Sequence, residues 1–388
     1  MKRWSTKPLG EIAQVAAGDP APQRAEDFSE DGIPFVRMQD VGRFGQTTCL
    51  AETKDRLSKS ASQKLKRFPT GSILVPKSGA SIRLNHRAIL GTEAHVVSHL
   101  AVIVPKPLLN TRFVYYWLCG TDLSGVAHQA DLPSMKTSDL AKLPVPVPPL
   151  AEQERIVKLL DEADELRKLR AQADRRIAAL IPAIFHEMFG DVEQNTRKWL
   201  TKAVAEVCDL VRGSSPRPKS DPRYYGGPIP RLMIEDITRD GWSVTPRVDS
   251  LTELGATMSR PVKAGTIVMA VSGNIGLCAQ LAVDACVHDG FVAFKDLHSD
   301  LFVPQFFGMA MGQMRQSHER SQAGAIFQNI TTTDVKAMRI PVPPLPLQKI
   351  FADRMKEIRE LEARQITSHT RLDTLFQSLL HRAFNGEL

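Results

Sequence analysis

Two long polar segments of this sequence each follow a short run of prolines and carry apolar residues at helical spacing. The first follows the prolines at positions 144, 146, 148 and 149, and the second follows those at 341, 343, 344 and 346. Steps of three, four or seven residues place one narrow apolar stripe on a helix, as in a coiled-coil seam. The stripe residues are Ile156, Leu159, Ala163, Leu166, Ala173, Ile177, Leu180 and Ile184 in the first segment, and Phe351, Met355, Ile358, Leu361, Leu372, Phe376, Leu379 and Ala383 in the second.

The prolines predict where these two helices begin. Each proline fixes its own φ and disfavours helix at the residue before it, so both leads are expected to be extended. Glu152 and Glu154 then fall in the first turn of the first helix, where the helix dipole favours negative charge. A helix from Ala151 to Phe189 would be roughly 58 Å long. Pro182 is expected to kink its last turns or to break them off.

The whole sequence consists of two copies of one unit, offset by about 195 residues, as from Trp4 to Trp199. Two copies in one chain tend to be related by a pseudo-twofold axis, as two subunits of a homodimer would be. The repeat therefore predicts that the two long helices pack antiparallel, with one globular domain towards each end. Further matching pairs, in order, are Gly18 and Gly213, Asp40 and Asp236, Gly71 and Gly265, Ser78 and Ser272, Asp139 and Asp334, and His186 and His381.

The repeat also predicts the domain boundaries. We expect a globular domain at 1–143, a proline lead with the first long helix at 144–190, a second globular domain at 191–338, and a second lead and helix at 339–388. Each globular domain should be α/β (α+β), with mixed short strands. Expected strands are Pro34–Gln39, Ser72–Pro76 and Val96–Val104, then Leu232–Ile234, Thr266–Val271, Ala279–Val283 and Phe291–Phe294; expected short helices are Thr111–Cys119 and Pro304–Gln316.

Composition narrows the class of protein. A chain of 388 residues can form two or more domains, each with its own core. The five cysteines are scattered without a C-x-x-C pair, no apolar run approaches transmembrane length, and the first residues lack a signal-peptide core. We therefore expect a cytoplasmic protein with free thiols and no structural zinc. A net charge of +7 permits a nucleic-acid partner without demonstrating one.

Sequence motifs for catalysis are missing. The sequence has no G-x-x-x-x-G-K-[ST], no glycine-rich turn of the dinucleotide-binding kind, no Asn/Asp-Pro-Pro-aromatic run, and no H-E-x-x-H, G-x-S-x-G or His/Cys cluster. The acidic run from Asp161 to Glu165 falls inside the first long helix, where a solvated face is a simpler interpretation than a metal site. His186 and His381 are better explained by packing or capping. We expect no catalytic residue, no bound metal and no cofactor.

Three kinds of loop carry side chains suited to DNA. Basic residues neutralise phosphates and tyrosines pack on sugars in the loop after Arg212. In the loop after each Ser-Gly pair, glycine lets the backbone come close to DNA, and Arg and Asn are side chains that read base edges. Ordinary surface-loop or turn chemistry is the alternative for each. The candidates are Arg217, Lys219, Arg223, Tyr224, Tyr225 and Arg231 after Arg212; Lys77, Ser78, Arg83, Asn85 and Arg87, with Ser272 and Asn274, after the Ser-Gly pairs; and Lys136, Gln328 and Asn329 in a polar turn.

In combination, these motifs resemble the specificity (S) subunit of type I restriction-modification systems, and the resemblance covers essentially the whole chain. It is carried by the paired Pro-Val-Pro-Pro-Leu leads, by Gln153 and Gln348 just after them, and by the two long helices. It is also carried by the closing segment from Leu375 to Leu388 and by the second copy's Tyr225-Gly-Gly-Pro-Ile-Pro and Ser272-Gly-Asn-Ile-Gly motifs.

The resemblance implies a function without catalysis in this chain. Such subunits contain two target-recognition domains that each read one half of a two-part DNA site. Their helices act as a ruler, here of about 17 base pairs, and dock two methylation subunits. The methylation subunits methylate adenine with S-adenosylmethionine, and restriction subunits add ATP-driven translocation and cleavage of DNA. S-adenosylmethionine, ATP and Mg therefore belong to partner subunits. The residues expected to bind partner subunits are Gln153, Ile156, Leu159, Leu166, Gln348, Phe351, Phe376 and Leu379.

The two copies depart from each other where DNA contacts are expected. The first lacks the tyrosine-rich loop, and its Ser-Gly loop has Ala80-Ser81-Ile82 where the second has Asn274-Ile275-Gly276. The two domains should therefore read different sequences. Two alternatives remain open: an orphan subunit that directs methylation only, and a coiled-coil scaffold that binds no DNA. An unrecognised enzyme is a third, disfavoured by the missing motifs.

Overall fold

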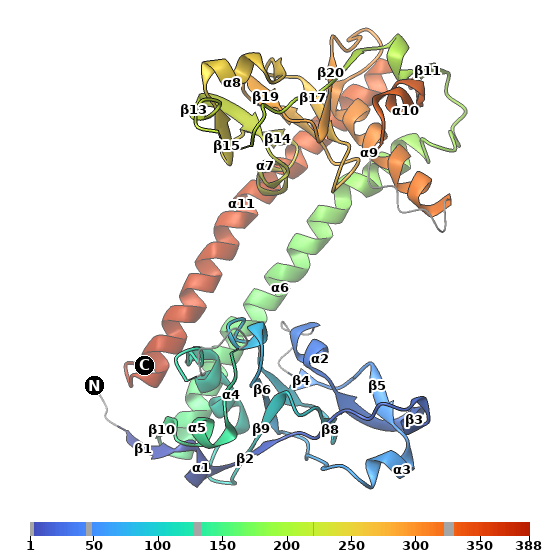
Figure 1. The fold of residues 1–388 in the computed structure, drawn as a ribbon. Coiled ribbons are helices and arrows are strands. Elements are labelled where there is room, and N and C mark those ends of the chain that lie inside the picture. Colours follow the sequence, from blue (N-terminus) through green and yellow to red (C-terminus); the bar gives the residue numbers. More distant parts are fainter. Residues whose placement is uncertain (1–3, 44–48, 127–132, 220, 322–329) are drawn as a thin grey trace. The chain divides into compact units, whose positions relative to one another are not determined.

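The computed structural model describes residues 4–43, 49–126, 133–219, 221–321 and 330–388 (Figure 1). Its contacts divide the chain into two compact units. Unit 1 comprises Met1–Ala173 and Gln365–Leu388, and unit 2 comprises Asp174–Arg364. Each unit thus combines one globular domain with part of each long helix.

Unit 1 is built on three small sheets. A five-stranded sheet has the order β2 (Ala13–Ala17), β9 (Leu100–Pro105), β6 (Ile73–Pro76), β7 (Ala88–Leu90) and β4 (Cys49–Leu50). A three-stranded sheet has the order β5 (Asp55–Leu57), β3 (Phe28–Val36) and β8 (His95–Val96), and β1 (Ser5–Pro8) pairs with β10 (Pro144–Val147). The helices of this domain are α1 (Leu9–Ile12), α2 (Met38–Arg43), α3 (Lys59–Ser62), α4 (Thr111–Gly120) and α5 (Thr137–Ala141), with short 3-10 helices at Ala25–Asp27 and Ala80–Ile82.

Unit 2 repeats this topology. Its five-stranded sheet has the order β12 (Asp209–Arg212), β20 (Phe291–Lys295), β17 (Ile267–Ala270), β18 (Cys278–Leu281) and β14 (Ser243–Val244). A second sheet has the order β15 (Asp249–Leu251), β13 (Tyr225–Leu232), β19 (Ala285–Val287) and β16 (Pro261–Val262), and β11 (Thr201–Ala203) pairs with β21 (Arg339–Pro341). The helices are α7 (Ile234–Asp240), α8 (Glu253–Thr257), α9 (Pro304–Ser321) and α10 (Thr332–Ala337), with a 3-10 helix at Val204–Glu206. The internal repeat and the mixed α/β class are confirmed.

Both faces of the central sheet are covered in each unit. In unit 1, Ile73 and Val75 of β6 enter one hydrophobic cluster, while Leu74 between them enters another. Ile267 and Met269 of β17 alternate with Val268 in the same way in unit 2. Successive side chains of a strand point to opposite faces, so a sheet covered on both faces needs a continuous apolar run.

The repeated glycines and aspartates have structural roles in both copies. A Cβ at Gly18 would lie 2.1 Å from the carbonyl oxygen of Val96, and one at Gly213 would lie 2.0 Å from that of His288. Only glycine therefore permits this close backbone approach. The buried carboxylates of Asp40 and Asp236 accept backbone hydrogen bonds at the starts of α2 and α7, from Arg37 N at 2.7 Å and from Met233 N at 3.0 Å.

These two aspartates also explain where the strand predictions were wrong. The strands expected at Pro34–Gln39 and Leu232–Ile234 are the ends of β3 and β13, which begin earlier, at Phe28 and Tyr225. They end at Val36 and Leu232, because α2 begins at Met38 and α7 at Ile234. The expected strand Val96–Val104 is two strands, β8 and β9, separated by a turn in which Leu100 N donates to Val97 O at 3.0 Å. The short helices at 111 and 304 are confirmed as α4 and α9.

Both proline leads are extended, and each pairs with the start of its own copy. Within unit 1, Pro144–Val147 pairs antiparallel with Ser5–Pro8; within unit 2, Arg339–Pro341 pairs with Thr201–Ala203. Val145 and Ile340 from these strands are fully buried. The leads are thus edge strands of the globular domains as well as extended approaches to the helices.

The long helices α6 (Leu150–Phe189) and α11 (Leu345–Phe384) pack antiparallel within each unit. In unit 1, the beginning of α6 packs through Ile156 and Leu160 on Phe376, near the end of α11. In unit 2, Phe189 at the end of α6 packs on Phe351 near the start of α11, with ring centroids 5.6 Å apart.

Of the two outcomes expected at Pro182, a kink or a break, the structure excludes the break. The first helix continues to Phe189, because buried Ile181, Phe185 and Phe189 hold its last turns in the core of unit 2. The apolar stripe is also shifted: Leu160 and Ile181 are buried, whereas Leu166 is 53% and Leu180 40% exposed. The helix ends face their own globular domains, so the buried face follows those domains rather than one heptad seam. Among the described residues, no helix is both long enough and apolar enough to cross a membrane.

Candidate nucleic-acid interface

The Ser-Gly loop of unit 2 is a tight connection between β17 and β18. Gly273 and Gly276 have φ values of +68° and +83°, in the left-handed region that favours glycine. Asn274 between them is exposed, and Ser272 is half-buried at the base of the loop. The predicted candidates Ser272 and Asn274 are therefore brought together, with the Asn274 amide available to an external partner.

The Ser-Gly loop of unit 1 is longer and differently anchored. Lys77 N donates to His99 O at 3.0 Å, and Lys77 O accepts from Met135 N at 2.8 Å. The Ser78 hydroxyl lies 2.8 Å from His99 Nδ1. Arg83 is exposed at the tip of the loop. These contacts fix the base of the loop and leave the Arg83 guanidinium outside.

Asn85 and Arg87 at the far end of this loop are partly or wholly engaged within unit 1. Asn85 is exposed but adopts φ +52°, and its Nδ2 donates to Cys119 O at 2.8 Å. Arg87 is only 3% exposed. The expected base-reading role of Arg87 is wrong for this conformation, because a guanidinium enclosed by its own domain cannot reach a groove.

The basic loop after Arg212 is largely tied to its own domain. Arg217 pairs with Asp289 at 3.1 Å, and Arg223 pairs with Asp221 at 2.7 Å while lying 5.4 Å from the centroid of the Tyr224 ring. Lys219 is exposed. All three basic side chains of this loop are exposed. A carboxylate already pairs with Arg217 and with Arg223, which weakens the attraction of these two for phosphate.

Tyr225 and Arg231 are part of the support of this loop. The Tyr225 hydroxyl donates to Pro216 O at 2.8 Å. Arg231 is 7% exposed, pairs with Asp249 on the neighbouring strand, and donates to the Ser215 hydroxyl at 2.8 Å. Its guanidinium also lies 5.4 Å from the Tyr225 ring centroid. The prediction that Arg231 contacts DNA directly is wrong, because its charge is used inside the domain.

The third group of candidates is only partly described. Lys136 is exposed at the start of α5, and the neighbouring Ser134 bridges to Ser78, so this turn adjoins the Ser-Gly loop of unit 1. Gln328 and Asn329 lie outside the described residues.

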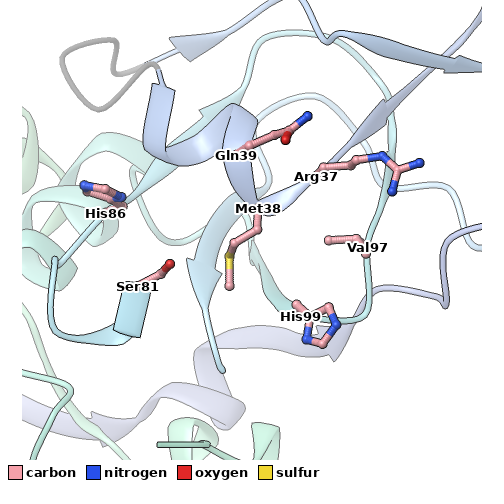
Figure 2. Close-up of a pocket in the computed structure, with 7 residues that line it drawn as sticks. All are labelled: Arg37, Met38, Gln39, Ser81, His86, Val97 and His99. Atoms are coloured by element: carbon pink, nitrogen blue, oxygen red, sulfur yellow. The ribbon is translucent and has the colours of Figure 1, made fainter. Parts of the chain in front are cut away.

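A pocket in unit 1 gathers polar side chains that the sequence analysis did not single out (Figure 2). Its volume is about 580 Å³. Gln39 is exposed at the start of α2, and Met38 extends into the pocket below it. The other lining residues are Arg37, Ser81, His86, Val97 and His99. The pocket is thus lined by the Ser-Gly loop, by the start of α2 and by the turn before β9.

The sequence held one signal for this site. The repeated Asp40 and Asp236 cap their helices, which places Gln39 and Glu235, one residue earlier, at equivalent exposed positions. A glutamine amide can bind adenine bidentately, whereas a carboxylate accepts from the cytosine amino group. The two copies therefore present different hydrogen-bonding groups from the same place in the fold: an amide that donates and accepts in unit 1, and a carboxylate that only accepts in unit 2.

In unit 2, His288 lies close enough to Glu235 for the two side chains to interact electrostatically. Burial, reinforced by the charge of Arg231, lowers the pKa of His288 below its usual value. Its Nδ1 accepts a hydrogen bond from Gly290 N at 2.9 Å. His288 is therefore neutral at pH 7 and adds no positive charge near Glu235.

A family model described as "Type I restriction modification DNA specificity domain" matches residues 1–177 and 196–369. The chain belongs to this family. The two matched stretches correspond to the two copies of the repeat, each with its proline lead and much of its long helix.

Individual relatives support this membership. The putative type I restriction enzyme MjaX specificity subunit of Methanocaldococcus jannaschii is 24% identical over 92% of this chain and 87% of its own length. The MjaIX specificity subunit of the same organism is 31% identical, but the match spans only 38% of this chain and 34% of that subunit. The match to the EcoR124I/EcoR124II specificity subunit of Escherichia coli, at 26% identity, spans 41% of that subunit.

Solved structures share the fold. One, from a study of complex assembly and conformational transition of the type I R-M system, aligns with a TM-score of 0.63 at 20% identity over 100% of this chain and 99% of that chain. The S subunit of the type I system from M. genitalium aligns with a TM-score of 0.55 at 14% identity, over 98% of this chain and 96% of that chain.

Gln153 and Gln348 carried part of the family resemblance. Each hydrogen-bonds two separate backbone segments within its own unit. Both are fully buried. Gln153 Oε1 accepts from Asn110 N at 2.8 Å, and its Nε2 donates to Pro148 O at 2.9 Å. Gln348 makes the same contacts in unit 2, with Val303 N at 2.9 Å and Pro343 O at 2.8 Å. Each glutamine therefore joins its proline lead to the segment before α4 or α9.

Most of the residues expected to bind partner subunits are not accessible. Ile156, Phe351 and Phe376 are buried in hydrophobic clusters, as Gln153 and Gln348 are in their hydrogen bonds. The prediction that these five residues contact a partner directly is wrong for this conformation, because their own domains enclose their side chains. Leu159 and Leu379 are half-buried, and Leu166 is more than half exposed.

The described residues contain no group of three or more metal-ligating side chains. All five cysteines are free in this structure. Burial raises the pKa of Cys119 to about 11 and the pKa values of Cys208 and Cys278 to about 12. These three thiols are therefore protonated and unreactive at neutral pH.

Proposed function

We propose that this chain recognises a two-part DNA sequence for a type I restriction-modification complex, with one half-site read by each globular domain. The observation that carries the proposal is the pair Gln39 and Glu235. The two copies share topology and helix caps, yet they differ in the side chain exposed at the same place. A repeat that keeps its scaffold and changes its exposed polar groups suits recognition of two different sequences.

In this reading, base contacts come from the start of α2 or α7 and from the Ser-Gly loops. Gln39 is suited to an adenine and Glu235 to the amino group of a cytosine. Asn274 and Arg83 are exposed on the neighbouring loops. Lys219 and Lys136 are exposed cations suited to phosphates, which position a protein on DNA without reading sequence.

We further propose that the helices dock two methylation subunits, with restriction subunits joining the same complex. Adenine methylation with S-adenosylmethionine, and translocation and cleavage with ATP and Mg, would then belong to those partners. The support is the family membership together with exposed apolar side chains on the helices. In unit 1, Leu166 is 53% and Ile366 68% exposed. Since the substrate is DNA, we place the complex in the cytoplasm of a bacterium or archaeon.

The test is a genome-wide map of methylated adenines in cells that express this chain with its methylation subunit. The expected result is a two-part motif with a fixed gap that vanishes when the gene is deleted. Gln39→Ala should relax one base position in one half-site only, and Glu235→Ala one position in the other. Arg371→Ala, at an exposed position on α11, is the matched control and should leave the motif unchanged.

The outcomes separate the alternatives. A motif unaffected by both variants, or changed in the same half by each, contradicts the assignment of one domain to each half-site. A methylation map with no restriction of unmodified DNA indicates the orphan subunit. If purified chain and complex bind no DNA in low salt, the coiled-coil scaffold replaces our proposal.

A further inference from the structure

Arg37 is the first residue after β3 and lines the pocket shown in Figure 2. Its Nε donates to Asp55 Oδ2 on the neighbouring strand β5. Its guanidinium carbon also lies 5.7 Å from the ring centroid of Phe28 and 5.5 Å from that of Phe35. One carboxylate and two aromatic rings thus fix the orientation of this guanidinium.

Unit 2 contains a similar arginine–aspartate pair, but its arginine comes from another position. The strand registers pair Phe35 with Asp55 in unit 1 and Arg231 with Asp249 in unit 2. The two aspartates are therefore equivalent, whereas Arg37 stands two residues beyond the equivalent of Arg231. Side chains two residues apart lie on one side of an extended chain, so an arginine at either position can reach the aspartate.

The two arginines differ in what they leave accessible. The side chain of Arg231 is 9% exposed, and its Nη2 donates to the Ser215 hydroxyl inside the domain. The side chain of Arg37 is 34% exposed and lines the same pocket as Gln39. Nη1 and Nη2 of Arg37 make no hydrogen bond within the described part of the chain, and neither atom is fully enclosed. Arg37 therefore has donors that an external partner can reach.

The pairing with Asp55 favours a base over a phosphate as that partner. Attraction for phosphates depends on positive charge, which the carboxylate of Asp55 offsets. The Nη groups of Arg37 nevertheless remain donors in a rigid, planar fork. Such a fork matches O6 and N7 of guanine, the two acceptors that arginine binds in the major groove.

We propose that Arg37 reads a guanine in the half-site of unit 1 and that Asp55 is its positioning residue. The inference rests on the proposed DNA recognition and adds a second base contact beside Gln39. Unit 2 should make no equivalent contact, because Arg231 is buried and Met233 occupies the position of Arg37. The two half-sites should therefore also differ by the presence of this guanine.

The experiment compares maps of methylated adenines made by the full-length chain together with its methylation subunit. Arg37→Met introduces the residue that unit 2 has at this position. It should make one guanine degenerate in one half-site and leave the other half-site unchanged. Arg67→Met is the matched control, since Arg67 is exposed in the same unit and pairs with Glu93 at 3.0 Å. This control should leave the whole motif unchanged.

A change of one atom in the DNA tests the contact without altering the protein. Each guanine of the half-site is replaced in turn with 7-deazaguanine, which lacks the N7 acceptor. At one position this replacement should weaken binding of the wild-type complex about tenfold, and that of the Arg37→Met complex less than about twofold. Asp55→Asn removes the charge beside Arg37 and should reduce the effect at that position to about threefold. A purely structural role of Asp55 would leave the effect of 7-deazaguanine unchanged.

The outcomes separate this inference from the proposed function. If a two-part motif depends on this chain but Arg37→Met leaves every guanine required, Arg37 is a structural ion pair only. The same conclusion follows if 7-deazaguanine weakens binding of the wild type at no position, or if Arg37→Met changes the half-site that Glu235→Ala changes. If no two-part motif depends on this chain, the proposed function fails, and this inference fails with it.

Discussion

Gln348 provides a direct test of how unit 2 is held to its long helix. Its fully buried side chain accepts from Val303 N at 2.9 Å and donates to Leu301 O and to Pro343 O, each at 2.8 Å. Gln348→Ala removes all three bonds and leaves three backbone groups without a partner. At about 1–1.5 kcal/mol for each bond, the free energy of unfolding of unit 2 should fall by about 3–5 kcal/mol.

The effect is measured most locally by hydrogen exchange. The Val303 amide loses its acceptor, so its exchange should accelerate by about 10²–10³-fold, since 1.4 kcal/mol corresponds to a factor of ten. Lys349→Ala is the matched control, because Lys349 is exposed in the same turn of α11. It should leave Val303 unchanged.

The equivalent variant in unit 1 sharpens the test. Gln153 makes two good hydrogen bonds, whereas its third, to Leu108 O, is 3.4 Å long. Gln153→Ala should therefore cost about 2–3 kcal/mol, less than Gln348→Ala, and should affect exchange at Asn110. The reasoning is refuted if Val303 exchange changes less than about threefold in Gln348→Ala, or no more than in Lys349→Ala.

Three further predictions concern the glycine contact, one titrating carboxylate and the basic loop. Gly213→Ala places a Cβ 2.0 Å from a carbonyl oxygen and should lower the free energy of unfolding of unit 2, measured by denaturant titration, by at least about 3 kcal/mol. Hydrogen bonding to Arg239 lowers the pKa of Asp240 to about 2, so its stabilisation is full above pH 4 and is lost as pH falls through 2. Asp240→Asn should accordingly be less stable than the wild type at pH 7 and equal to it near pH 2 by thermal unfolding; a constant difference across this range contradicts the assignment. Replacing three basic residues of the loop with Ala should flatten the slope of log affinity for DNA against log salt by about 1–3, and an unchanged slope would remove that loop from the interface. These residues are Arg217, Lys219 and Arg223; Lys219 should contribute most, because the other two have carboxylate partners.

The sequence by itself determined the repeat, the extended leads and the two long helices. These features depend on local rules: proline restricts its own backbone and the residue before it, and apolar spacing shows one buried face of a helix. The repeat needed only comparison of the sequence with itself. Gly18 and Gly213 could be singled out in that way, although their reason, contact with carbonyl oxygens of a distant turn, could not.

Only the tertiary structure decided which polar residues face inward. Gln153 and Gln348 bind backbone groups 43 and 45 residues away, respectively, and Arg231 pairs across a sheet with Asp249. Arg37 and Arg231 pair with equivalent aspartates, and only packing leaves the first partly exposed and buries the second. A long polar side chain on a loop or an edge reads the same in sequence whether it meets solvent, DNA or its own domain. Which of these three surroundings has the lowest free energy depends on partners distant in the chain. Gln39 precedes the repeated Asp40, but only the folded chain shows that it lines one pocket with Ser81 and His99.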